Sequence, residues 1–488
     1  MTSPSHPRGT RRIIYTEDPS SLAVYLYPED IAPHDMQSFV DELARGGADA
    51  LAKDVFSTGV SVYWKTDLTD YDPRPQHRRF GKLIDEGVEP LNLYIDRCRK
   101  HGMTFLAGFR MNDRHWVCPF WERNPQWHLD RGTFDYRHDG VRDWMLSMMT
   151  EIVERYDVDG LELDWMRLPP VFAERPALPE QCSVITRFVA RIRRMLEKAG
   201  AAKGRTLTLG VRVPAWLDEC LTFGFDVATW ITDGLIDSVT PTDASYCDFH
   251  ARYREDFGAL TCDRPCMLYP AIHPIHDRAI QNFAQGIMTL DHYRALAHSL
   301  YAQGADGLSV YNYQYHWRGD PRTDVGYPEV LGYFRHLRDP DEIAGHRREY
   351  LYYPMYQGPI LGFEKSFLLT ISPGENGAER EAFRFRAYER DSGATSLTMR
   401  FVATARQPRW KGALLRPYEP LLLTVDVNGH EVAPACSMYG DEGTRYEFEV
   451  SAGWLNDGDN ELGIRLLKDQ PIEGDVTIKN VELEVTPE

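Results

Sequence analysis

The sequence predicts an α/β protein in which a (β/α)8 TIM barrel is followed by an all-β sandwich domain. Between residues 21 and 338, short apolar runs alternate with longer amphipathic stretches, which is typical of a parallel sheet covered by helices. From about Phe363 onward, strand-like alternation dominates and no helical period appears. The 488 residues also exceed one ordinary core. We therefore expect a polar N-terminal segment 1–20, a catalytic barrel 21–338, a linker 339–362 and an accessory sandwich 363–488.

The predicted barrel has eight strands with helices between them. The strands are expected at 22–26, at either 50–55 or 61–64, and then at 104–110, 158–164, 207–213, 238–242, 266–270 and 307–311. Helices are expected at 35–46, 83–101, 140–156, 185–199 and 290–302. A doubly wound open sheet is the alternative fold, but no glycine-rich phosphate fingerprint follows the first strand.

The C-terminal region predicts seven or eight antiparallel strands. These are expected at 367–371, 382–388, 396–401, 421–427, 446–450, 461–467 and 476–485. Turn sequences such as Asn428-Gly429 separate them. This arrangement is typical of a β-sandwich.

Composition narrows the partners and the compartment. The net charge of −18 argues against nucleic acid and anionic membranes as partners, and no apolar run reaches the length that crosses a bilayer. Eight scattered cysteines include no Cys-x-x-Cys pair, so we expect free thiols in a reducing compartment. The N-terminus lacks the apolar region of a signal peptide, which favours a cytoplasmic location, although a processed secreted protein would look the same.

The strand at 158–164 carries acids on one face. Glu162, Asp164 and Met166 share that face, because successive strand side chains alternate. Buried acids are costly unless they line a polar cavity, and a barrel provides one at the C-terminal ends of its strands. Asp164 is therefore the first candidate catalytic carboxylate, with capping or pairing to Arg167 as the alternative. Glu162 lies one step deeper and is either a catalytic partner or a buried partner of an arginine.

Other strand ends supply the remaining candidates. Asp243 follows the sixth strand and is either the second catalytic carboxylate or a loop residue in an Asx-turn. Aromatic rings stack on sugars, and arginine and asparagine donate to hydroxyl groups. The candidate substrate-binding residues are Arg110, Asn112, Asp113, Trp116, Arg167, Arg212, Tyr269, His273, Tyr311 and Asn312. Asp54 is a further candidate, with Lys53 as a donor.

The three arginines have two interpretations. Arg110, Arg167 and Arg212 would suit a uronate or sulfated sugar through bidentate pairing. Alternatively, they neutralise Glu162 and Asp164. His273 and His276 have a metal-ligand spacing, but no third ligand is apparent nearby, so we expect no metal and no cofactor.

Two motifs carry a family resemblance. The run Tyr156-Asp157-Val158-Asp159-Gly160 precedes an Asp-bearing strand end, and the run 226–237 precedes the sixth strand. Together they resemble the glycoside hydrolase family 10-like proteins over about the first two-thirds of the chain, which implies a TIM-barrel glycosidase. The 158–164 strand is also similar to that of family 18 chitinases, but Met166 occupies the position of their catalytic Glu, so substrate-assisted chemistry is not expected. The tail resembles a galactose-binding-like jelly roll.

We therefore expect hydrolysis of a glycosidic bond in a poly- or oligosaccharide through paired carboxylates. Several retaining α-glycosidase families place a nucleophilic Asp after strand four and an acid Asp after strand six, which matches Asp164 and Asp243 in position. A uronate-polysaccharide lyase and a catalytically silent carbohydrate-binding protein are the alternatives. The expected partner is a carbohydrate, and homo-oligomerisation is left open.

Overall fold

The computed structural model describes two compact units. The described residues are 12–57, 59–113, 119–130, 133–243, 247, 249–276, 286–318, 325–353, 368–373, 379–406, 420–439, 443–468 and 473–487. Of these, the first unit takes in residues up to Cys247 together with Arg252–Pro274 and Gln303–Arg338. The second unit takes in Asp248–Ala251, Ile275–Ala302 and the residues from Asp339 onward.

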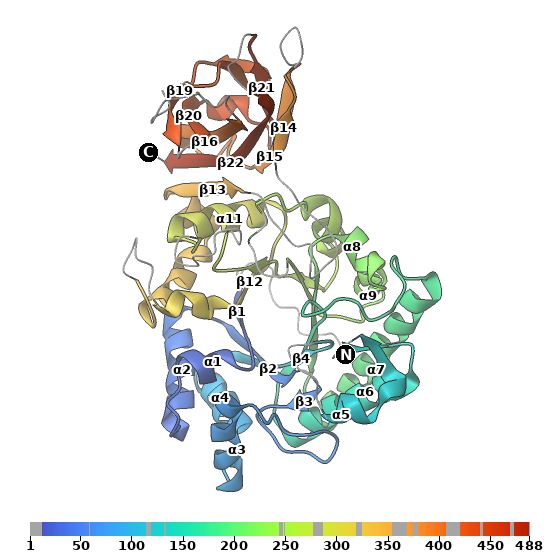
Figure 1. The fold of residues 1–488 in the computed structure, drawn as a ribbon. Coiled ribbons are helices and arrows are strands. Elements are labelled where there is room, and N and C mark those ends of the chain that lie inside the picture. The colour runs from blue at the N-terminus through green and yellow to red at the C-terminus, as the bar shows by residue number, and fades with distance from the viewer. Residues whose placement is uncertain are drawn as a thin grey trace, which may run out of the picture. The chain divides into compact units, whose positions relative to one another are not determined.

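The first unit is built on a parallel sheet flanked by helices (Figure 1). The strand order is β10-β9-β8-β7-β4-β2-β1-β12-β11, and each neighbouring pair is parallel. The strands are β1 (Arg12–Glu17), β2 (Ala50–Ser57), β4 (Thr104–Arg110), β7 (Gly160–Asp164), β8 (Thr208–Pro214), β9 (Ser238–Thr242), β10 (Met267–Leu268), β11 (Ala271–Ile272) and β12 (Gly307–Tyr311). A short strand, β3 (Val60–Ser61), pairs antiparallel with β2. Only Tyr269 and Pro270 separate β10 from β11, the two ends of this order.

Long amphipathic helices connect the strands. The principal ones are α2 (Pro33–Gly46), α4 (Pro90–Lys100), α6 (Asp139–Arg155) and α7 (Pro179–Lys203). The shorter ones are α1 (Ser21–Tyr25), α3 (Arg78–Asp85), α5 (Pro119–Arg123), α8 (Leu217–Thr222), α9 (Val227–Thr232), α10 (Ala259–Thr261) and the 3₁₀ helix η5 (Glu329–Leu337). Local sequence explains their limits: α2 and α7 each begin with proline, and left-handed Gly47 and Gly204 end them.

Two expected elements are wrong. The expected strand at 22–26 is the helix α1, and the first strand is β1, which lies within the segment expected to be polar. The buried residues of this strand include Ile13, Ile14 and Tyr15, but an apolar run of this length between polar residues is too short to predict a strand from the sequence. The expected single helix at 83–101 is two helices, because Gly87 has a φ of 86° and Pro90 starts a new helix. The choice for the second strand resolves to β2, and the strands expected at 104–110, 238–242 and 307–311 are confirmed.

Aspartates repeat at the starts of the strands. Asp49, Asp159, Asp237 and Asp306 each stand immediately before a strand, namely β2, β7, β9 and β12. Each carboxylate accepts a backbone N–H near the start of another parallel strand, at 2.7–2.9 Å: those of Ile13, Phe105, Leu209 and Leu268 respectively. This device satisfies backbone donors at the amino-terminal ends of the strands. Two of these aspartates belong to the motifs that carry the family resemblance.

The alternation expected on β7 is confirmed. Leu161 and Leu163 are fully buried on one face, where Trp165 also packs against Phe225 with ring centroids 5.0 Å apart. Glu162 and Asp164 occupy the other face and are also buried. Both faces of this strand are therefore covered, as in a parallel sheet inside an α/β protein.

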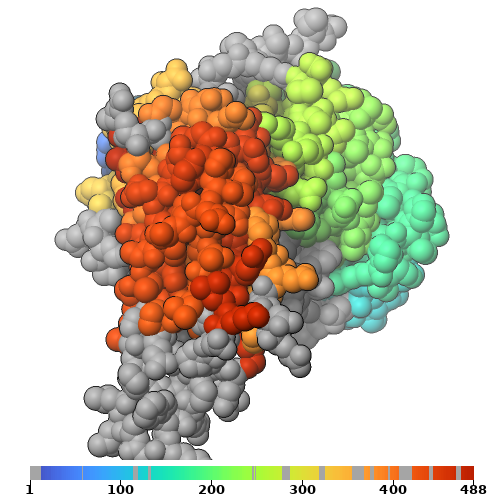
Figure 2. All heavy atoms as spheres, turned by 90° about the horizontal axis from the view of Figure 1, so that it is seen from above, coloured from blue at the N-terminus to red at the C-terminus, as the bar shows by residue number. Residues whose placement is uncertain are grey.

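The second unit contains two antiparallel sheets. The first has the order β13-β22-β16-β20-β19 with β14 paired to β22, and the second has the order β15-β21-β17-β18. In Figure 2, which draws all heavy atoms as spheres, the described residues of the strands from β14 to β22 are coloured orange to red. They are β13 (Arg348–Tyr352), β14 (Leu369–Ile371), β15 (Glu381–Ala387), β16 (Ala394–Arg406), β17 (Leu423–Val427), β18 (His430–Val432), β19 (Ala435–Tyr439), β20 (Gly443–Val450), β21 (Gly458–Leu466) and β22 (Glu473–Pro487). The helices α11 (Leu290–Ala302) and α12 (Pro340–Ala344) also belong to this unit.

Strand β13 falls inside the segment 339–362 that we expected to be a linker. Its Tyr350 and Tyr352 are fully buried, and Tyr352 packs on Phe385 of the second sheet with ring centroids 5.4 Å apart. Tyrosine and proline in this segment predicted a connection, but the alternating tyrosines of β13 contribute to the core of the unit. No helix of the described residues is both long and apolar enough to cross a membrane.

A buried ion pair ties β13 to the end of β15. Arg348 donates from Nε and Nη2 to the two carboxylate oxygens of Glu389 at 2.8 and 2.7 Å, and Tyr350 donates its hydroxyl to Glu389 at 2.6 Å. Both charged side chains are fully buried. Removing one partner of such a pair leaves the other charge buried without compensation.

We predict that Glu389→Gln destabilises the protein by about 3–5 kcal/mol, because the amide cannot neutralise Arg348. Arg380→Ala, which breaks the more exposed pair with Asp426, should cost about 0–1 kcal/mol. Urea unfolding at neutral pH, followed by circular dichroism, measures both. Equal losses in the free energy of unfolding of the two variants would contradict a larger contribution from the buried pair.

Candidate active site

Charged and polar side chains meet at the C-terminal ends of the parallel strands. The register pairs Arg110 at the end of β4 with Asp164 at the end of β7, and Asp164 with Arg212 on β8. Tyr311 ends β12, and all four side chains are buried. Sequence reasoning predicted each of these residues at a strand end, and the structure brings them together.

Asp164 is held by two donors. The backbone N–H of Met166 donates to Oδ1 at 2.8 Å, and Arg212 Nη1 donates to Oδ2 at 2.9 Å. Both partners are donors only, so they match an ionised carboxylate, which only accepts. Two fixed donors also orient the carboxylate plane.

Glu162 lies deeper on the same face. Its Oε1 accepts a hydrogen bond from the hydroxyl of Thr16 at 3.2 Å, and Thr16 is in turn 3.3 Å from the hydroxyl of Ser309. Glu162 is therefore surrounded by β1, β7 and β12 below the row that contains Asp164. This position is that of a supporting acid.

Arg110 connects several carboxylates. Its Nε donates to Asp54 at 3.0 Å, its Nη1 donates to Asp113 at 3.1 Å, and its Nη2 forms an ion pair with Asp18. Ser57 also donates to Asp113 at 3.0 Å. One guanidinium group thus contacts acids that follow β1, lie on β2 and follow β4.

Tyr311 joins the arginines. Its hydroxyl accepts hydrogen bonds from Arg110 Nη2 at 2.8 Å and from Arg167 Nη1 at 3.2 Å. The guanidinium of Arg212 lies over the Tyr311 ring, 3.9 Å from its centroid, a cation–π contact. The ring of His273 meets the same tyrosine edge-on at 5.9 Å.

Burial and neighbouring charges separate the acids by pKa. Burial raises the pKa of Glu162 to about 8 and that of Asp54 to about 7, against the opposing effects of Arg212 and Arg110 respectively. Burial acts in the same direction on Asp18, but Arg110 and Arg167 outweigh it and lower its pKa well below the usual range. Near neutral pH, Asp18 is therefore ionised, Glu162 is largely protonated, and Asp54 is close to its midpoint.

Two further groups are neutral at pH 7. Burial, reinforced by Arg212, lowers the pKa of His273 to about 3, so its imidazole is uncharged. Burial also raises the pKa of Tyr311 to about 12, although Arg110 and Arg167 oppose the rise. His273 Nε2 lies 3.0 Å from the hydroxyl of Thr242, which donates to the backbone carbonyl of Asp243 at 2.8 Å. Buried Asp243 thus stands beside His273 at the end of β9.

The structure does not bring every candidate to this cluster. Tyr269 packs with Ile14, Ala50, Ala52 and Leu106, deeper in the sheet. Burial raises the pKa of Tyr269 to about 12, and the nearby Arg12, which begins β1, opposes this rise. We expected Tyr269 to face the C-terminal end, but the Pro270 break between β10 and β11 follows it and leaves it in the interior.

Lys53, Asn112 and Asn312 have local roles. Lys53 forms a buried ion pair with Glu17 and packs over Tyr63, so it is not the donor near Asp54 that we expected. The Asn112 amide bonds the backbone of Phe134 and Pro170 and fixes the loop after β4. Asn312 has a φ of 56°, in the left-handed region, and turns the chain after β12. Trp116 lies outside the described residues.

Sequence reasoning missed Asp18 and Thr16. Both were placed in the polar segment 1–20, so no strand end was expected there. The run Ile13-Ile14-Tyr15 followed by Asp18-Pro19 was the signal that could have found them, since it is an apolar strand that ends in an acid and a proline.

No group of three or more His, Cys, Asp or Glu side chains within the described ranges is placed to hold a metal ion. His276, the second histidine of the 273–276 motif, packs instead against the rings of His292 and Tyr353 in the second unit. All seven described cysteines are free thiols, as expected.

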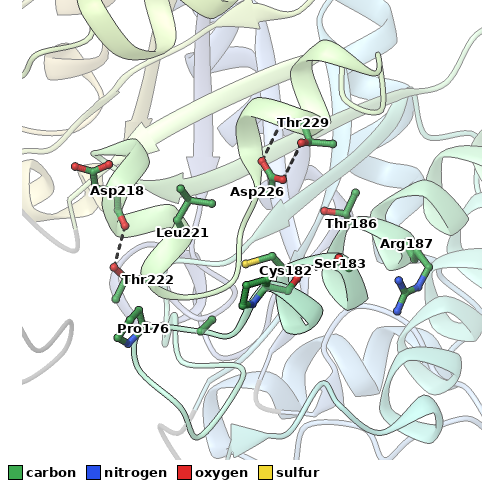
Figure 3. A pocket seen from close by; sticks show the side chains of 12 residues that line it. Pro176, Cys182, Ser183, Thr186, Arg187, Asp218, Leu221, Thr222, Asp226 and Thr229 are labelled. Carbon is green, nitrogen blue, oxygen red and sulfur yellow. Dashed lines mark hydrogen bonds between the residues drawn. The ribbon is translucent and has the colours of Figure 1, made fainter.

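A separate pocket of about 720 Å³ lies between α7, α8, α9 and the loop before α7 (Figure 3). Its polar groups have local partners: Thr222 bonds the carbonyl of Asp218, and Asp226 accepts from the N–H and hydroxyl of Thr229. The Asp226 contacts cap α9, and the Thr222 contact lies within α8. We therefore place the candidate active site at the strand ends.

Comparison with protein-family models finds no match, and comparison with curated proteins finds none. Solved structures that resemble the chain include α-L-fucosidase isoenzyme 2 from Paenibacillus thiaminolyticus, at 14% identity over 66% of this chain and 48% of that one, with a TM-score of 0.43. An α-amylase from Geobacillus thermoleovorans matches at 13% identity over 93% and 98%, with a TM-score of 0.42. The α-galactosidase of Thermus thermophilus matches at 13% identity over 68% and 62%, with a TM-score of 0.38. These neighbours are glycoside hydrolases, but at such scores the likeness carries no argument about activity.

Gly108 gives the site room. An added Cβ at this residue would lie 3.0 Å from Asp54 Cα and closer still to Asp54 Oδ1. We predict that Gly108→Ala destabilises the protein by about 1–3 kcal/mol through overpacking. Gly332→Ala, where nothing lies within 4 Å, should be neutral or slightly stabilising. Thermal unfolding compares the two variants, and similar midpoints would contradict the close packing described.

Proposed function

We propose that this protein is a glycoside hydrolase acting on an oligo- or polysaccharide, with Asp164 as nucleophile and Asp243 as general acid/base. The observation that carries the proposal is the state of Asp164: a fully buried carboxylate at a strand end, oriented by Met166 N–H and Arg212. Strand ends of this kind hold the catalytic groups of α/β barrels.

The proposed reaction is a double displacement. A carboxylate oxygen of Asp164 attacks the anomeric carbon while Asp243 protonates the departing glycosidic oxygen. Asp243 then removes a proton from water, whose oxygen attacks the same carbon and releases Asp164. Arg212 compensates the charge of Asp164 when the glycosyl ester breaks. This double displacement retains the anomeric configuration and requires the two carboxyl groups to lie about 5–5.5 Å apart, whereas a separation of about 6.5–9.5 Å would indicate a single displacement with inversion.

Several finer expectations enter this proposal. We infer that β10 and β11 act as one interrupted strand, because β10 pairs with β9 and β11 pairs with β12, which would close an eight-stranded barrel. The two antiparallel sheets would form the accessory sandwich. The resemblance to family 10-like proteins, a carbohydrate partner and a cytoplasmic location belong to the same proposal.

The contacts of the arginines weigh against a uronate lyase. Arg110 is already paired with Asp18, Asp54 and Asp113, and Arg212 is paired with Asp164. The raised pKa of Tyr311 also makes it a poor base near neutral pH. Neutralisation of nearby acids therefore explains these two arginines better than capture of a sugar carboxylate.

We predict that Asp164→Ala lowers kcat about 10³-fold or more on any glycan the protein cleaves, because the glycosyl–enzyme bond cannot form. Added azide should restore turnover of this variant and give a glycosyl azide. Asp243→Ala should lower kcat/KM about 10²–10⁴-fold on natural linkages but little on aryl glycosides, whose good leaving groups depart without a proton, while kcat falls on both because water is no longer activated. Released reducing ends, measured over a panel of polysaccharides, identify the substrate.

Circular dichroism must show that each variant is folded, so that a loss of activity can be assigned to the substituted residue. Turnover that survives Asp164→Ala unchanged would remove Asp164 from the mechanism. An ultraviolet-absorbing unsaturated product would select the lyase. Tight binding of a glycan that is never cleaved would select the silent binding protein.

A further inference from the structure

Asp54 and Glu162 face each other across a glycine. The register places Asp54 of β2 beside Gly108 of β4, and Gly108 beside Glu162 of β7. All three positions lie on the same face of the sheet, and Gly108 has no side chain to fill the space between the two acids. The crowding of Asp54 Oδ1 against the Gly108 position shows that the Asp54 carboxyl leans over the glycine.

The free oxygen of Asp54 is buried without a partner. Its Oδ2 accepts from Arg110, but its Oδ1 has no hydrogen-bond partner within the described part of the chain. An ionised carboxylate oxygen without a hydrogen-bond partner would be costly in a buried site, whereas a protonated carboxyl group carries no charge. Glu162 has no ion pair with an arginine among the described contacts and accepts from the neutral hydroxyl of Thr16.

The charges around the pair balance only when both acids are neutral. The cations that face this cluster are Arg110, Arg167 and Arg212, and the acids are Asp18, Asp54, Asp113, Glu162 and Asp164. Lys53 is also close to Asp54, but it forms its own ion pair with Glu17, and the two add no net charge. His273 is neutral and Tyr311 is un-ionised. With protons on Asp54 and Glu162, three guanidinium groups face three carboxylates.

We propose that Asp54 and Glu162 form a protonated carboxyl pair beneath the active site, and that they are positioning residues which leave Arg212 to Asp164 alone. The role in positioning rests on the proposed function, while the protonation does not. If Glu162 ionised, its carboxylate would compete with Asp164 for Arg212, which faces both. The nucleophile would then lose part of its orientation.

The pKa values set the direction of the effect on stability. The pKa of Asp54 is about 7 and that of Glu162 about 8 in the folded protein, both above their ordinary values near 4. Between about pH 4 and pH 8, the unfolded chain therefore binds fewer protons than the folded one. Stability contributed by these groups falls as pH rises through this window, and the loss is complete only about one pH unit above the pKa of Glu162.

Infrared difference spectra of the full chain between pH 6 and pH 9 test the protonation directly. The wild-type protein should show a protonated-carboxyl C=O band at pH 6 that disappears by pH 9. Asp54→Asn and Glu162→Gln should each remove part of this band, and the double variant should remove it. Asp41→Asn is the control: Arg97 and His101 lower the pKa of Asp41, which lies on α2 and has no role in the shifts of Asp54 and Glu162, so this substitution should leave the band unchanged.

Thermal unfolding and kinetics test the consequences. The unfolding midpoint of Glu162→Gln should fall less than that of wild type from pH 6 to pH 9. On a cleaved glycan, kcat of wild type should decline over the same interval. Glu162→Gln should show a smaller decline than wild type, because only Asp54 of the pair still titrates, and it should keep more activity than Glu162→Ala.

The two proposals can fail separately. Absence of the band at pH 6, or its persistence in the double variant, overturns the protonated pair even if a glycan is cleaved. A band that behaves as expected in a protein that cleaves no glycan supports the pair and overturns the hydrolase. A decline of kcat from pH 6 to pH 9 that is as large in Glu162→Gln as in wild type overturns the positioning role of Glu162.

Discussion

The cost of burying charge is the constraint on which this site depends. At the strand ends, Arg110 contacts three carboxyl groups and the Tyr311 hydroxyl, and its own side chain is almost fully buried. A single guanidinium can do this because it presents five donors in a fixed plane. Arg212 donates a hydrogen bond to Asp164, and its guanidinium group lies over the ring of Tyr311. Without these two side chains the inward acids could not be buried together.

Glycines provide the space that the charged groups fill. Glu162 has Gly108 beside it on β4 and Gly210 beside it on β8, so neither neighbouring strand places a side chain at its level. An added Cβ at Gly210 would come within 2.8 Å of the Ser238 hydroxyl. Long acids and arginines thus alternate with glycines along the sheet. Gly108 and Gly210 therefore prevent overpacking around the inward polar groups beside them.

The sequence predicted the strands better than the site. The strands β4 and β12 were found with their limits, because each is an apolar run that follows a predicted helix. β1 was missed since its apolar run is short, and Asp18 was lost with it. Strand ends alone could not distinguish Tyr269 from Tyr311, because Tyr269 precedes the Pro270 break and packs in the core, whereas Tyr311 ends β12 and reaches the arginines. The aspartates of the two resemblance motifs also differ in role from Asp164. Asp159 and Asp237 stabilise the amino-terminal ends of strands, whereas Asp164 lies at the carboxyl-terminal end of its strand.

The contacts distinguish Asp164 from the acids around Arg110. Asp18 and Asp113 are engaged by Arg110, which shares its donors among several partners, and Asp54 and Glu162 have pKa values at or above neutrality. Asp164 has one donor on each oxygen, and each oxygen retains a second lone pair. A nucleophile needs this combination of fixed orientation, negative charge and an unused lone pair. The surrounding acids are therefore not redundant catalysts: they balance the charge of the arginines, and Asp164 is the carboxylate that keeps one fixed donor on each oxygen.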